Sequence, residues 1–473
     1  MKARHCFIYL FIIIPTVSVS SLGAQTEQAN AEKYWYYRQR FNRYFIYVGD
    51  KTGESMVVAS RNYDFLPSLD FGQHGVHFGY YLGMLATEYR LLVRGNQLQK
   101  ADSTLQELRF AMLAYTEQMD RCEHYWNKED CLDGFFIREN VPVDFIDTSL
   151  VDGKKHFDAL NKNLTSANTW NNDSGHFCGL AHGDPAWIDH LREVNVDKSP
   201  MSQDEAYGVM MGMALVAKCV PALEDEAKAI FELICLHITG RNVCRHCEGR
   251  PYLIRKPDCS PIAESRGGVT VFFGYGIAAA ASQVTGKSVD YFSHSFDLKT
   301  LPDRLKNYFQ TGKLTYTPGK NNRYFLWKIC SGGIPGDQEW NRAMAVSLAA
   351  MGDSWGKHTD KGLMRNSYRL RGRKTHDWRS FYLSLWRFLN DKAPDLSEKT
   401  LILSELDAAP SRGTYNMTTE LHPDHFAHGG WAYIYRYRAT FDEQYARKST
   451  IGIFNGLDYM LMYNLYRLIY EEN

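Results

Sequence analysis

Two kinds of helical segment alternate along this chain, and their alternation narrows the choice of fold more than any other feature. One kind is rich in Gly, Ala and Met, as in "SPMSQDEAYGVMMGMALVAK" at 199–218. The other carries charge on one face, as in the segment expected to be helical at 223–239. A helix that is apolar on nearly all sides is buried, whereas a striped helix faces water on one side. The pairs therefore predict buried helices surrounded by exposed ones.

The same pairing recurs through the chain from residue 75 to residue 470. The small residues of the buried members are Gly79 and Gly83, then Gly208 and Gly212, then Gly274, Gly276 and Ala278 to Ala281. We predict an all-α fold, an (α/α) toroid of about five or six helical hairpins, in which inner helices form a ring inside outer ones. An irregular helical bundle or an open solenoid is the alternative, although a regular solenoid requires a strict repeat period that the pairs lack.

Local signals place the ends of several helices. Ser202 with Glu205, and Thr104 with Glu107, each have the spacing of a capping box, which marks a helix start. Gly240 is positioned to end the helix at 223–239. A last long helix is expected at 448–470.

The first residues have the composition of a secretory signal peptide. Lys2 and Arg4 precede an apolar run from Phe7 to Val19, and small residues end at Ala24. We expect residues 1–24 to be removed, and an uncleaved anchor is the alternative. Residues 25–70 form an N-terminal segment with a β-hairpin around Asp50-Lys51-Thr52-Gly53, and residues 71–473 form a single helical domain.

Composition limits the classes of partner. The 473 residues carry a formal net charge of zero, so no global basic field indicates nucleic acid. No stretch after the leader approaches the length of about eighteen apolar residues that a membrane span needs. The sequence therefore predicts an exported protein with a small-molecule or oligosaccharide ligand, no nucleic-acid partner and no stable membrane span once the signal is removed.

The cysteines fit an exported chain but define no cofactor site. Cys122 and Cys131 flank a short polar loop, and we predict that they form a disulfide. Cys219 and Cys235 lie in apolar helical patterns and are expected to be core thiols. A further group, His237, Cys244, His246, Cys247 and Cys259, offers a zinc site, but a single CxxC is a weak signal beside disulfides or free thiols. We expect no cofactor.

The predicted ring brings the starts of all inner helices to one mouth. The long loops, about 121–201, 240–268 and 311–337, lie at the same mouth, and such loops commonly carry function. The candidate catalytic carboxylates there are Asp133, Asp144, Asp204 and Glu264. The candidate binding residues are His74, His77, Arg138, Gln203, Arg266, Trp340 and Trp378. Each also has a structural interpretation: Asp204 complements the helix dipole, and Glu264 pairs with Arg266.

The helical part, roughly 75–470, resembles the (α/α) toroids of glycoside hydrolases and polysaccharide lyases in architecture. The segments "FGQHGVHFGYYLG", "DGFFIRENVP" and "NGLDYMLMYNLY" are similar to exported bacterial proteins of unassigned function. The resemblance implies, for a hydrolase, one acid that protonates the leaving oxygen and a second carboxylate that activates water. For a lyase it implies Tyr, His and Arg or Asn around a uronic acid, for which Tyr275 and His176 are present.

Three functions remain open at this point. The first is an exported carbohydrate-active enzyme, a glycoside hydrolase with a carboxylate-lined cleft at the mouth. The second is a non-catalytic exported binding or envelope protein, whose acids would already be paired with Arg138 and Arg266. The third is a metal-dependent enzyme, because His74 and His77 have HxxH spacing and His176 and His182 lie in the long loop.

Overall fold

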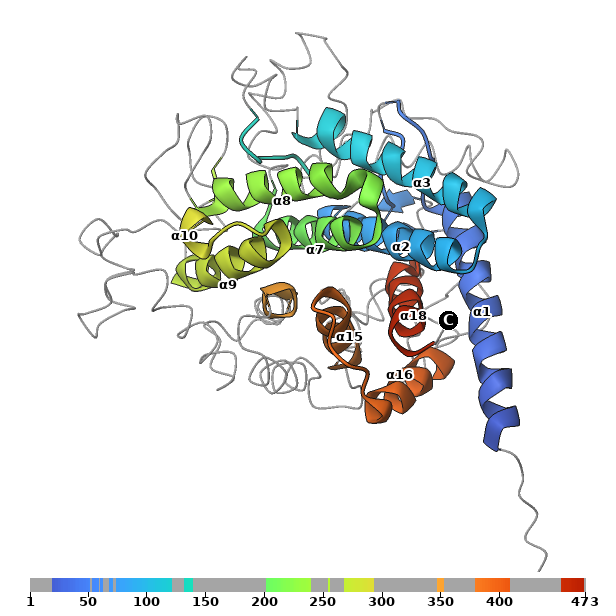
Figure 1. The fold of residues 1–473 in the computed structure, drawn as a ribbon. Coiled ribbons are helices and arrows are strands. Elements are labelled where there is room, and N and C mark those ends of the chain that lie inside the picture. The colour runs from blue at the N-terminus through green and yellow to red at the C-terminus, as the bar shows by residue number, and fades with distance from the viewer. Residues whose placement is uncertain are drawn as a thin grey trace, which may run out of the picture.

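The computed structural model is mostly helical in the part of the chain that it describes (Figure 1). The described residues are 19–51, 53–58, 60–62, 68–70, 74–120, 132–138, 201–239, 254–255, 268–292, 347–352, 379–408 and 452–471. The helices with assigned bounds are α1 (Val19–Tyr44), α2 (His74–Arg94), α3 (Leu98–Leu113), α7 (Gln203–Cys219), α8 (Glu224–Thr239), α9 (Gly268–Thr285), α10 (Val289–Phe292), α15 (Arg379–Leu389), α16 (Leu396–Ala408) and α18 (Leu457–Tyr470). A π-helical segment, Ala114–Asp120, continues α3, and a 3-10 turn, Pro221–Leu223, connects α7 to α8. The expected all-α class is confirmed.

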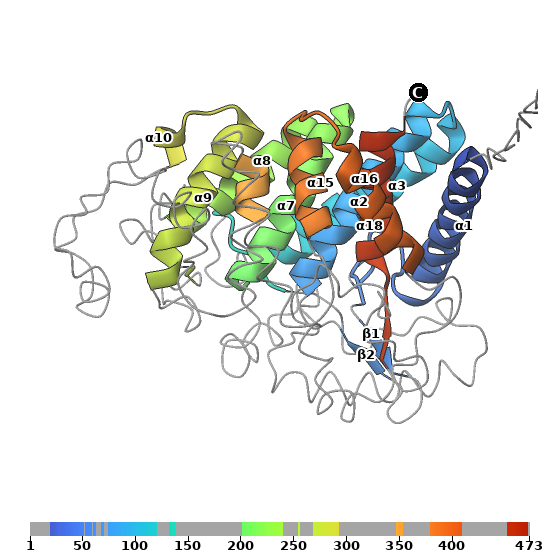
Figure 2. The same cartoon turned by 90° about the horizontal axis from the view of Figure 1, so that it is seen from below.

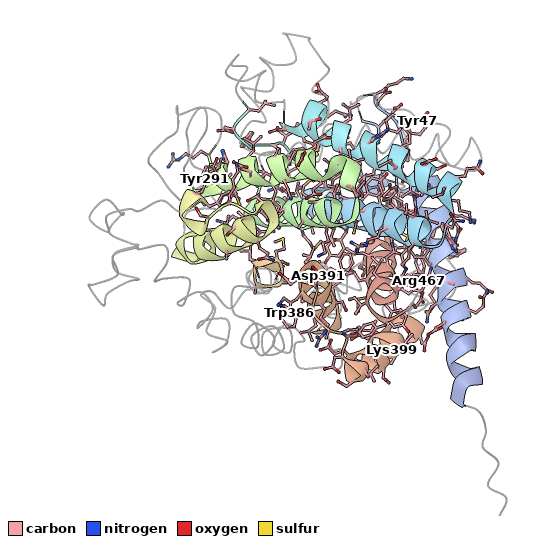
Figure 3. The ribbon with its side chains drawn as sticks, viewed as in Figure 1. Tyr47, Tyr291, Trp386, Asp391, Lys399 and Arg467 are labelled. Carbon is pink, nitrogen blue, oxygen red and sulfur yellow. The ribbon has the colours of Figure 1, made fainter. Side chains whose placement is uncertain are left out.

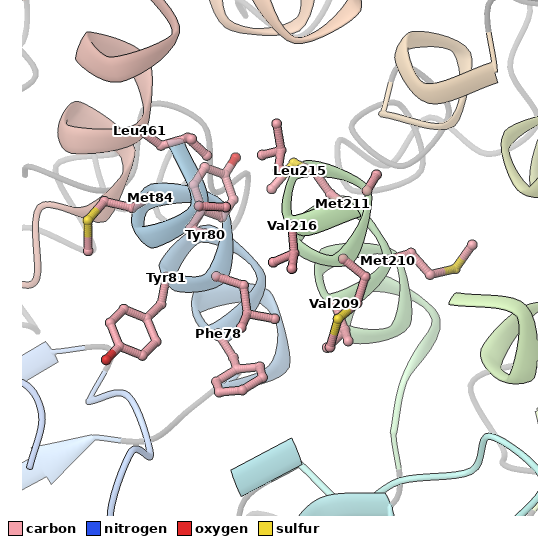
Figure 4. Packing of buried hydrophobic residues seen from close by; sticks show 14 of the residues in the cluster. Phe78, Tyr80, Tyr81, Met84, Val209, Met210, Met211, Leu215, Val216 and Leu461 are labelled. Atoms are coloured by element: carbon pink, nitrogen blue, oxygen red, sulfur yellow. The ribbon is translucent and has the colours of Figure 1, made fainter. Parts of the chain in front are cut away.

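Glycines bring α2 and α7 into backbone contact. A Cβ atom added to Gly79 would lie 1.9 Å from the carbonyl oxygen of Gly208, and one added to Gly212 would lie 2.6 Å from the carbonyl oxygen of Gly79. No larger residue fits at these positions unless the helices move apart. The small-residue pattern of the sequence thus corresponds to a close helix–helix seam, and large apolar side chains such as Phe78 and Val216 pack beside it (Figure 4).

Four helices, α2, α7, α15 and α18, run in the same direction, and we call them the central helices. Contacts that advance together along both members show this for each pair. Between α2 and α7 the contacts join Gly75 to Glu205, Gly79 to Gly208 and Gly83 to Leu215. Between α2 and α18 they join His77 to Asn455, Gly83 to Leu461 and Met84 to Asn464. Between α2 and α15 they join Tyr80 to Phe381 and Arg90 to Phe388. In Figure 2 the starts of the central helices lie at the lower end.

Two helices that pack outside this group, α3 and α8, run the opposite way. α3 returns along α2, where Tyr81 contacts Glu107. α8 returns along α7 and then packs on α9, where Cys235 contacts Ile277 and Glu232 contacts Lys287. Because α8 is antiparallel to both neighbours, α9 runs parallel to α7. The helices expected at 77–92, 202–218 and 268–284 therefore share one direction, as the sequence predicted.

A buried polar network holds α1 against the central helices. The guanidinium of Arg38 lies 3.1 Å from Oε2 of Glu88 and 2.5 Å from Oε2 of Glu107. Tyr34 donates to Glu88, and Tyr81 donates to Glu107 at 2.8 Å. The two carboxylates raise the pKa of Arg38 well above its usual value even though burial opposes this. Removing one member would leave an uncompensated charge in the interior.

The sequence did not predict α1. The described structure gives a helix where a hairpin-containing segment was expected, because Tyr34, Tyr37 and Phe41 repeat at helical spacing and are buried. The hairpin around Asp50 to Gly53 is not shown. The described residues there form a turn in which Val58 donates its amide to the carbonyl of Phe45 at 2.9 Å.

A small antiparallel sheet joins two strands that follow α1 to a strand that precedes α18. Its strands are β1 (Ser60–Asn62), β2 (Ser68–Asp70) and β3 (Gly452–Phe454), in the order β2-β1-β3. The helix expected at 448–470 is therefore wrong at its start, since β3 comes first and Gly456 precedes α18 in a left-handed conformation with φ of 82°. That backbone suits glycine, and Tyr37 and Arg40 also crowd the position.

One of the two expected capping boxes is wrong. α3 begins at Leu98, so Thr104 and Glu107 lie inside the helix and point to the buried network, where Thr104 donates to Glu88 at 2.8 Å. The box at Ser202 and Glu205 is confirmed. The core thiols Cys219 and Cys235 are also confirmed as buried and free, whereas Cys122 and Cys131 lie outside the described residues.

None of the helices in the described ranges has both the length and the apolar content that a membrane span needs.

Candidate functional site

The starts of α2 and α7 bring six of the predicted site residues to one end of the central helices or near it. The six that the structure describes are His74, His77, Asp133, Arg138, Gln203 and Asp204. The other predicted residues, Asp144, Glu264, Arg266, Trp340 and Trp378, lie outside the described residues, as do His176, His182, Cys244, Cys247 and Cys259. We call the end at His74 and Gln203 the N-terminal mouth.

Arg138 connects the two helix starts at the N-terminal mouth. Its Nε lies 3.1 Å from Oε2 of Glu205, and its side chain is 16% exposed while that of Glu205 is fully buried. Its carbonyl oxygen accepts a hydrogen bond from Nδ1 of His74 at 2.6 Å. The short loop at 132–138 is fixed by backbone bonds as well, since Phe136 accepts from the amide of Met201 at 3.0 Å. Apolar residues also anchor this loop, because Phe135, Phe136 and Ile137 are all buried.

The two histidines of the HxxH motif are buried in opposite tautomers. His74 donates from Nδ1 to a carbonyl, so its Nε2 carries a lone pair. His77 lies with Nδ1 2.9 Å from the side-chain nitrogen of Asn455, which also donates to Val58 while its oxygen accepts from Leu457. Those two bonds fix the orientation of Asn455, so it donates to His77 and the proton of His77 is on Nε2. Burial lowers the pKa of both imidazoles to about 3, and a coulombic interaction with His74 adds to the shift at His77.

This arrangement does not favour a metal site at the motif. A metal-binding imidazole offers a lone pair and donates from its other nitrogen. His74 meets that condition, but Nδ1 of His77 already accepts from Asn455. Within the part of the chain that the structure describes, no group of three or more His, Cys, Asp or Glu residues is arranged to hold a metal ion.

Asp133 has a partner on an outer helix. Its Oδ2 lies 3.2 Å from Nδ1 of His237 on α8, and its Oδ1 accepts the amide of Phe135 at 2.9 Å. The amide of Arg255 lies 3.4 Å from Nε2 of His237, which places the proton of His237 on Nδ1, facing Asp133. Gly134, with φ of 91°, lies directly against the backbone of Leu233. Through these contacts Asp133 and Gly134 hold the 132–138 loop against α8.

Asp204 lies in the first turn of α7 and is partly exposed. The hydroxyl of Ser202 donates to its Oδ1, and the amide of Ser202 donates to Oε2 of Glu205 at 3.1 Å. Gln203, the first residue of α7, is also partly exposed. Asp204 is thus a carboxylate at the N-terminal mouth whose neighbour Glu205, one residue further on, is buried and committed to Arg138.

Sequence reasoning missed a second polar group deeper along the central helices. We call it the interior layer: Tyr80 of α2, Tyr382 of α15 and Asp458 of α18, which are 3%, 2% and 0% exposed. Burial raises the pKa of Tyr80 well above its usual value, and Tyr382 and Asp458 add to the shift. A signal was present, since Asp458 is an acid within the otherwise apolar "GLDYMLM".

The chain matches no known protein family, no curated protein and no solved structure.

Proposed function

We propose that the chain closes into an (α/α) toroid and acts as an exported glycoside hydrolase at the N-terminal mouth. The observation that carries the proposal is the common direction of the central helices, which brings the polar first turns of α2 and α7 to one end. A closed ring of such hairpins would gather the remaining inner-helix starts, and the loops before them, around the same opening.

Asp204 is the described residue that best suits the role of a catalytic acid or base. It is partly exposed at the mouth, and the hydroxyl of Ser202 donates a hydrogen bond to its Oδ1. Glycoside hydrolysis needs a second carboxyl group at roughly 5–10 Å, with the wider spacings leading to inversion. Glu264 and Asp144 are the proposed partners, and Gln203, Arg266, Trp340 and Trp378 the proposed sugar-binding groups. Asp133 is a weaker candidate because His237 and the Phe135 amide engage both of its oxygens.

The experiment is a set of two substitutions with separate readouts of folding and turnover. Asp204→Asn keeps an oxygen that can accept a hydrogen bond from Ser202, so the free energy of unfolding should change by less than about 1 kcal/mol. If Asp204 is catalytic, release of reducing ends from a panel of oligosaccharides should fall by about 1,000-fold or more. Asp391→Asn is the control, because Asp391 is an 80% exposed carboxylate that pairs with Lys218 at the other end of α7 (Figure 3). A folded Asp204→Asn variant with full activity would remove Asp204 from the mechanism.

A second candidate is a non-catalytic exported binding protein with the same fold. The ion pair of Arg138 with Glu205 and the contact of Asp133 with His237 favour it, because polar groups that already have partners are less available for catalysis. The two candidates differ in one result: the binding protein would bind an oligosaccharide in calorimetry and release no product after prolonged incubation.

A further inference from the structure

We propose that the end of the central helices opposite the N-terminal mouth docks on the surface of an anionic lipid membrane. We call this end the basal face and define it by Arg90, Arg94 and Arg467 together with Leu98 and Leu396. The proposal does not depend on the glycoside hydrolase function, because membrane binding is measured without a substrate.

The parallel course of the central helices brings the turns after α2 and α15 to the basal face. The guanidinium of Arg90, near the end of α2, lies 5.4 Å from the centroid of the Phe388 ring, near the end of α15. The two helices therefore end at nearly the same level. Leu98 and Leu396 begin the helices that follow them, α3 and α16. In Figure 2 the basal face is the upper end, opposite the starts of the central helices.

The two leucines of the basal face are exposed to solvent. Leu396 is 76% and Leu98 56% exposed, the highest values among the large apolar side chains of the described ranges. Leu396 lies near the end of α18, since Glu398 accepts a hydrogen bond from the hydroxyl of Tyr470 at 3.4 Å. One exposed leucine is ordinary on a protein surface. Two leucines beside arginines have the composition of a membrane-surface site, where apolar side chains enter the acyl boundary and cations contact the headgroups.

The arginines of the basal face meet where α2 ends beside α18. The guanidinium of Arg94 donates to the carbonyl oxygen of Arg467 at 3.1 Å, and the side chain of Arg467 is 38% exposed. Burial lowers the pKa of Arg94, and the charges of Arg467 and Arg90 lower it further, while Glu471 acts in the opposite direction. The positive charge of Arg94 is thus disfavoured by its surroundings, and an anionic headgroup would reduce the repulsion.

The acids at the same end are paired or lie on the far side of α7. The carboxylate of Asp391 lies 2.5 Å from Nζ of Lys218, and that of Glu471 lies 2.5 Å from Nε of Arg467. The acidic first turn of α8, at 224–226, belongs to a helix that packs on α7 and α9. The positive charge of the basal face is therefore concentrated on the side of α2 and α18, where it is complementary to anionic lipid.

The start of α1 lies at the basal face as well. α1 runs antiparallel to α18, because Tyr37 packs on Tyr459 and Glu27 accepts from Tyr466, one helix end after the other. In Figure 2 the first turns of α1 are at the upper end. The apolar run at 7–19 immediately precedes α1 in the sequence. A chain led to a membrane by this run therefore has the basal face nearest to the lipid, with the N-terminal mouth directed away from it.

The test measures binding of the full chain, purified as the cell exports it, to lipid vesicles by co-sedimentation. One set of vesicles is phosphatidylcholine alone, and the other contains phosphatidylglycerol as well. The first variant is Arg94→Gln/Arg467→Gln, and the second is Leu98→Gln/Leu396→Gln. The changed side chains are partly or largely exposed, so both variants should fold, and urea unfolding checks this.

A matched control changes the same two residue types at the other end of α3. Arg109 and Leu113 are both exposed, and α3 runs towards the mouth. Arg109→Gln/Leu113→Gln should therefore bind vesicles as the wild type does. If the exported chain retains its leader, the leader contributes equally to every variant, and the differences between variants still report on the basal face.

We expect the wild type to bind vesicles that contain phosphatidylglycerol, and to bind less well as added salt shortens the Debye length from about 30 Å to about 8 Å. The arginine variant should bind about 20-fold more weakly, since each cation near an anionic surface contributes about fivefold. The leucine variant should lose about 10-fold or more through lost apolar burial.

Three results overturn the proposal. The first is no binding to either set of vesicles. The second is binding that the two basal-face variants retain, or that the control loses to the same extent. The third is binding that inorganic phosphate abolishes but sodium chloride of equal ionic strength does not, because the arginines would then bind a soluble anion. Any of the three leaves the hydrolase proposal untouched.

Discussion

The glycine seam between α2 and α7 allows a sharp test of the packing described above. Replacing Gly79 with Ala places a Cβ atom 1.9 Å from the carbonyl oxygen of Gly208 and 2.2 Å from its carbonyl carbon. These are backbone atoms, so no rotamer change relieves the contact. An ordinary contact of at least 3.4 Å requires a local separation of about 1.5 Å. A gap of 0.5–1 Å already forfeits about a quarter to a half of the dispersion energy of the atoms concerned.

Two opposing effects determine how much Gly79→Ala changes the free energy of unfolding. Overpacking in a close-packed core costs about 1–3 kcal/mol, and a contact between backbones belongs at the upper end of that range. Alanine is a better helix former than glycine by about 1 kcal/mol, which offsets part of the cost. We therefore expect Gly79→Ala to lower the free energy of unfolding by about 2 kcal/mol.

Two other glycines of the same region provide a graded control. Gly83→Ala meets the end of the Leu215 side chain at 2.6 Å, and a leucine can rotate away, so its cost should be about 1 kcal/mol. Gly95→Ala meets its nearest atom at 3.3 Å and should change stability by less than about 0.5 kcal/mol. Urea unfolding followed by far-UV circular dichroism measures all three. Equal effects at Gly79 and Gly95 would show that α2 and α7 do not touch as described.

Three further predictions concern other parts of the chain. Because the pKa values of His74 and His77 fall to about 3 on folding, the unfolded chain binds more protons than the folded chain between pH 6.5 and 3. The stabilisation is therefore full above pH 6.5, and the free energy of unfolding falls by about 1.4 kcal/mol per imidazole for each pH unit below it. A His74→Asn/His77→Asn variant should show a smaller loss of stability in acid unfolding. Arg38→Met leaves two buried carboxylates unbalanced and should cost about 3–5 kcal/mol in the same urea assay, whereas a loss below about 1 kcal/mol would contradict a buried ion pair. Cys122 and Cys131 should be found as one disulfide-linked peptide pair in mass spectrometry without reduction, and two alkylated thiols would refute the pairing.

Helix positions and burial followed from local composition. The small-residue seam could be predicted because glycine inside a helix is unfavourable unless two backbones approach closely, and Gly79, Gly208 and Gly212 all lie in it. The direction of the helices followed from their alternation. By contrast, α1 was missed because its buried stripe is aromatic and is interrupted by Arg38 and Arg40, whose charges are neutralised by partners far away in sequence or stacked on aromatic rings.

Long-range pairing also explains why the partners of several polar residues could not be predicted from the sequence. Thr104 and Glu107 have the spacing of a capping box, yet their side chains serve a network that α1 and α2 complete. The ion pair of Arg138 with Glu205 could not be predicted either, because nothing in the sequence links the two residues. Asp458 was overlooked for the same reason, since only the register of α18 on α2 brings it level with Tyr80.

The glycine seam also couples the fold to the proposed chemistry. The relative positions of His74, Arg138, Glu205 and Asp204 are set where α2 and α7 start, and the backbone contact at Gly79 fixes how closely those starts approach. Oε2 of Glu205 lies 3.1 Å from Nε of Arg138 and accepts a hydrogen bond from the Ser202 amide without any ligand, so these groups are in place before a substrate arrives. Such preorganisation means that a shift of about 1 Å in the helix spacing can cost about 100-fold in rate. If the hydrolase proposal holds, Gly79→Ala should therefore reduce activity at temperatures where the variant is still fully folded, and Gly95→Ala should not.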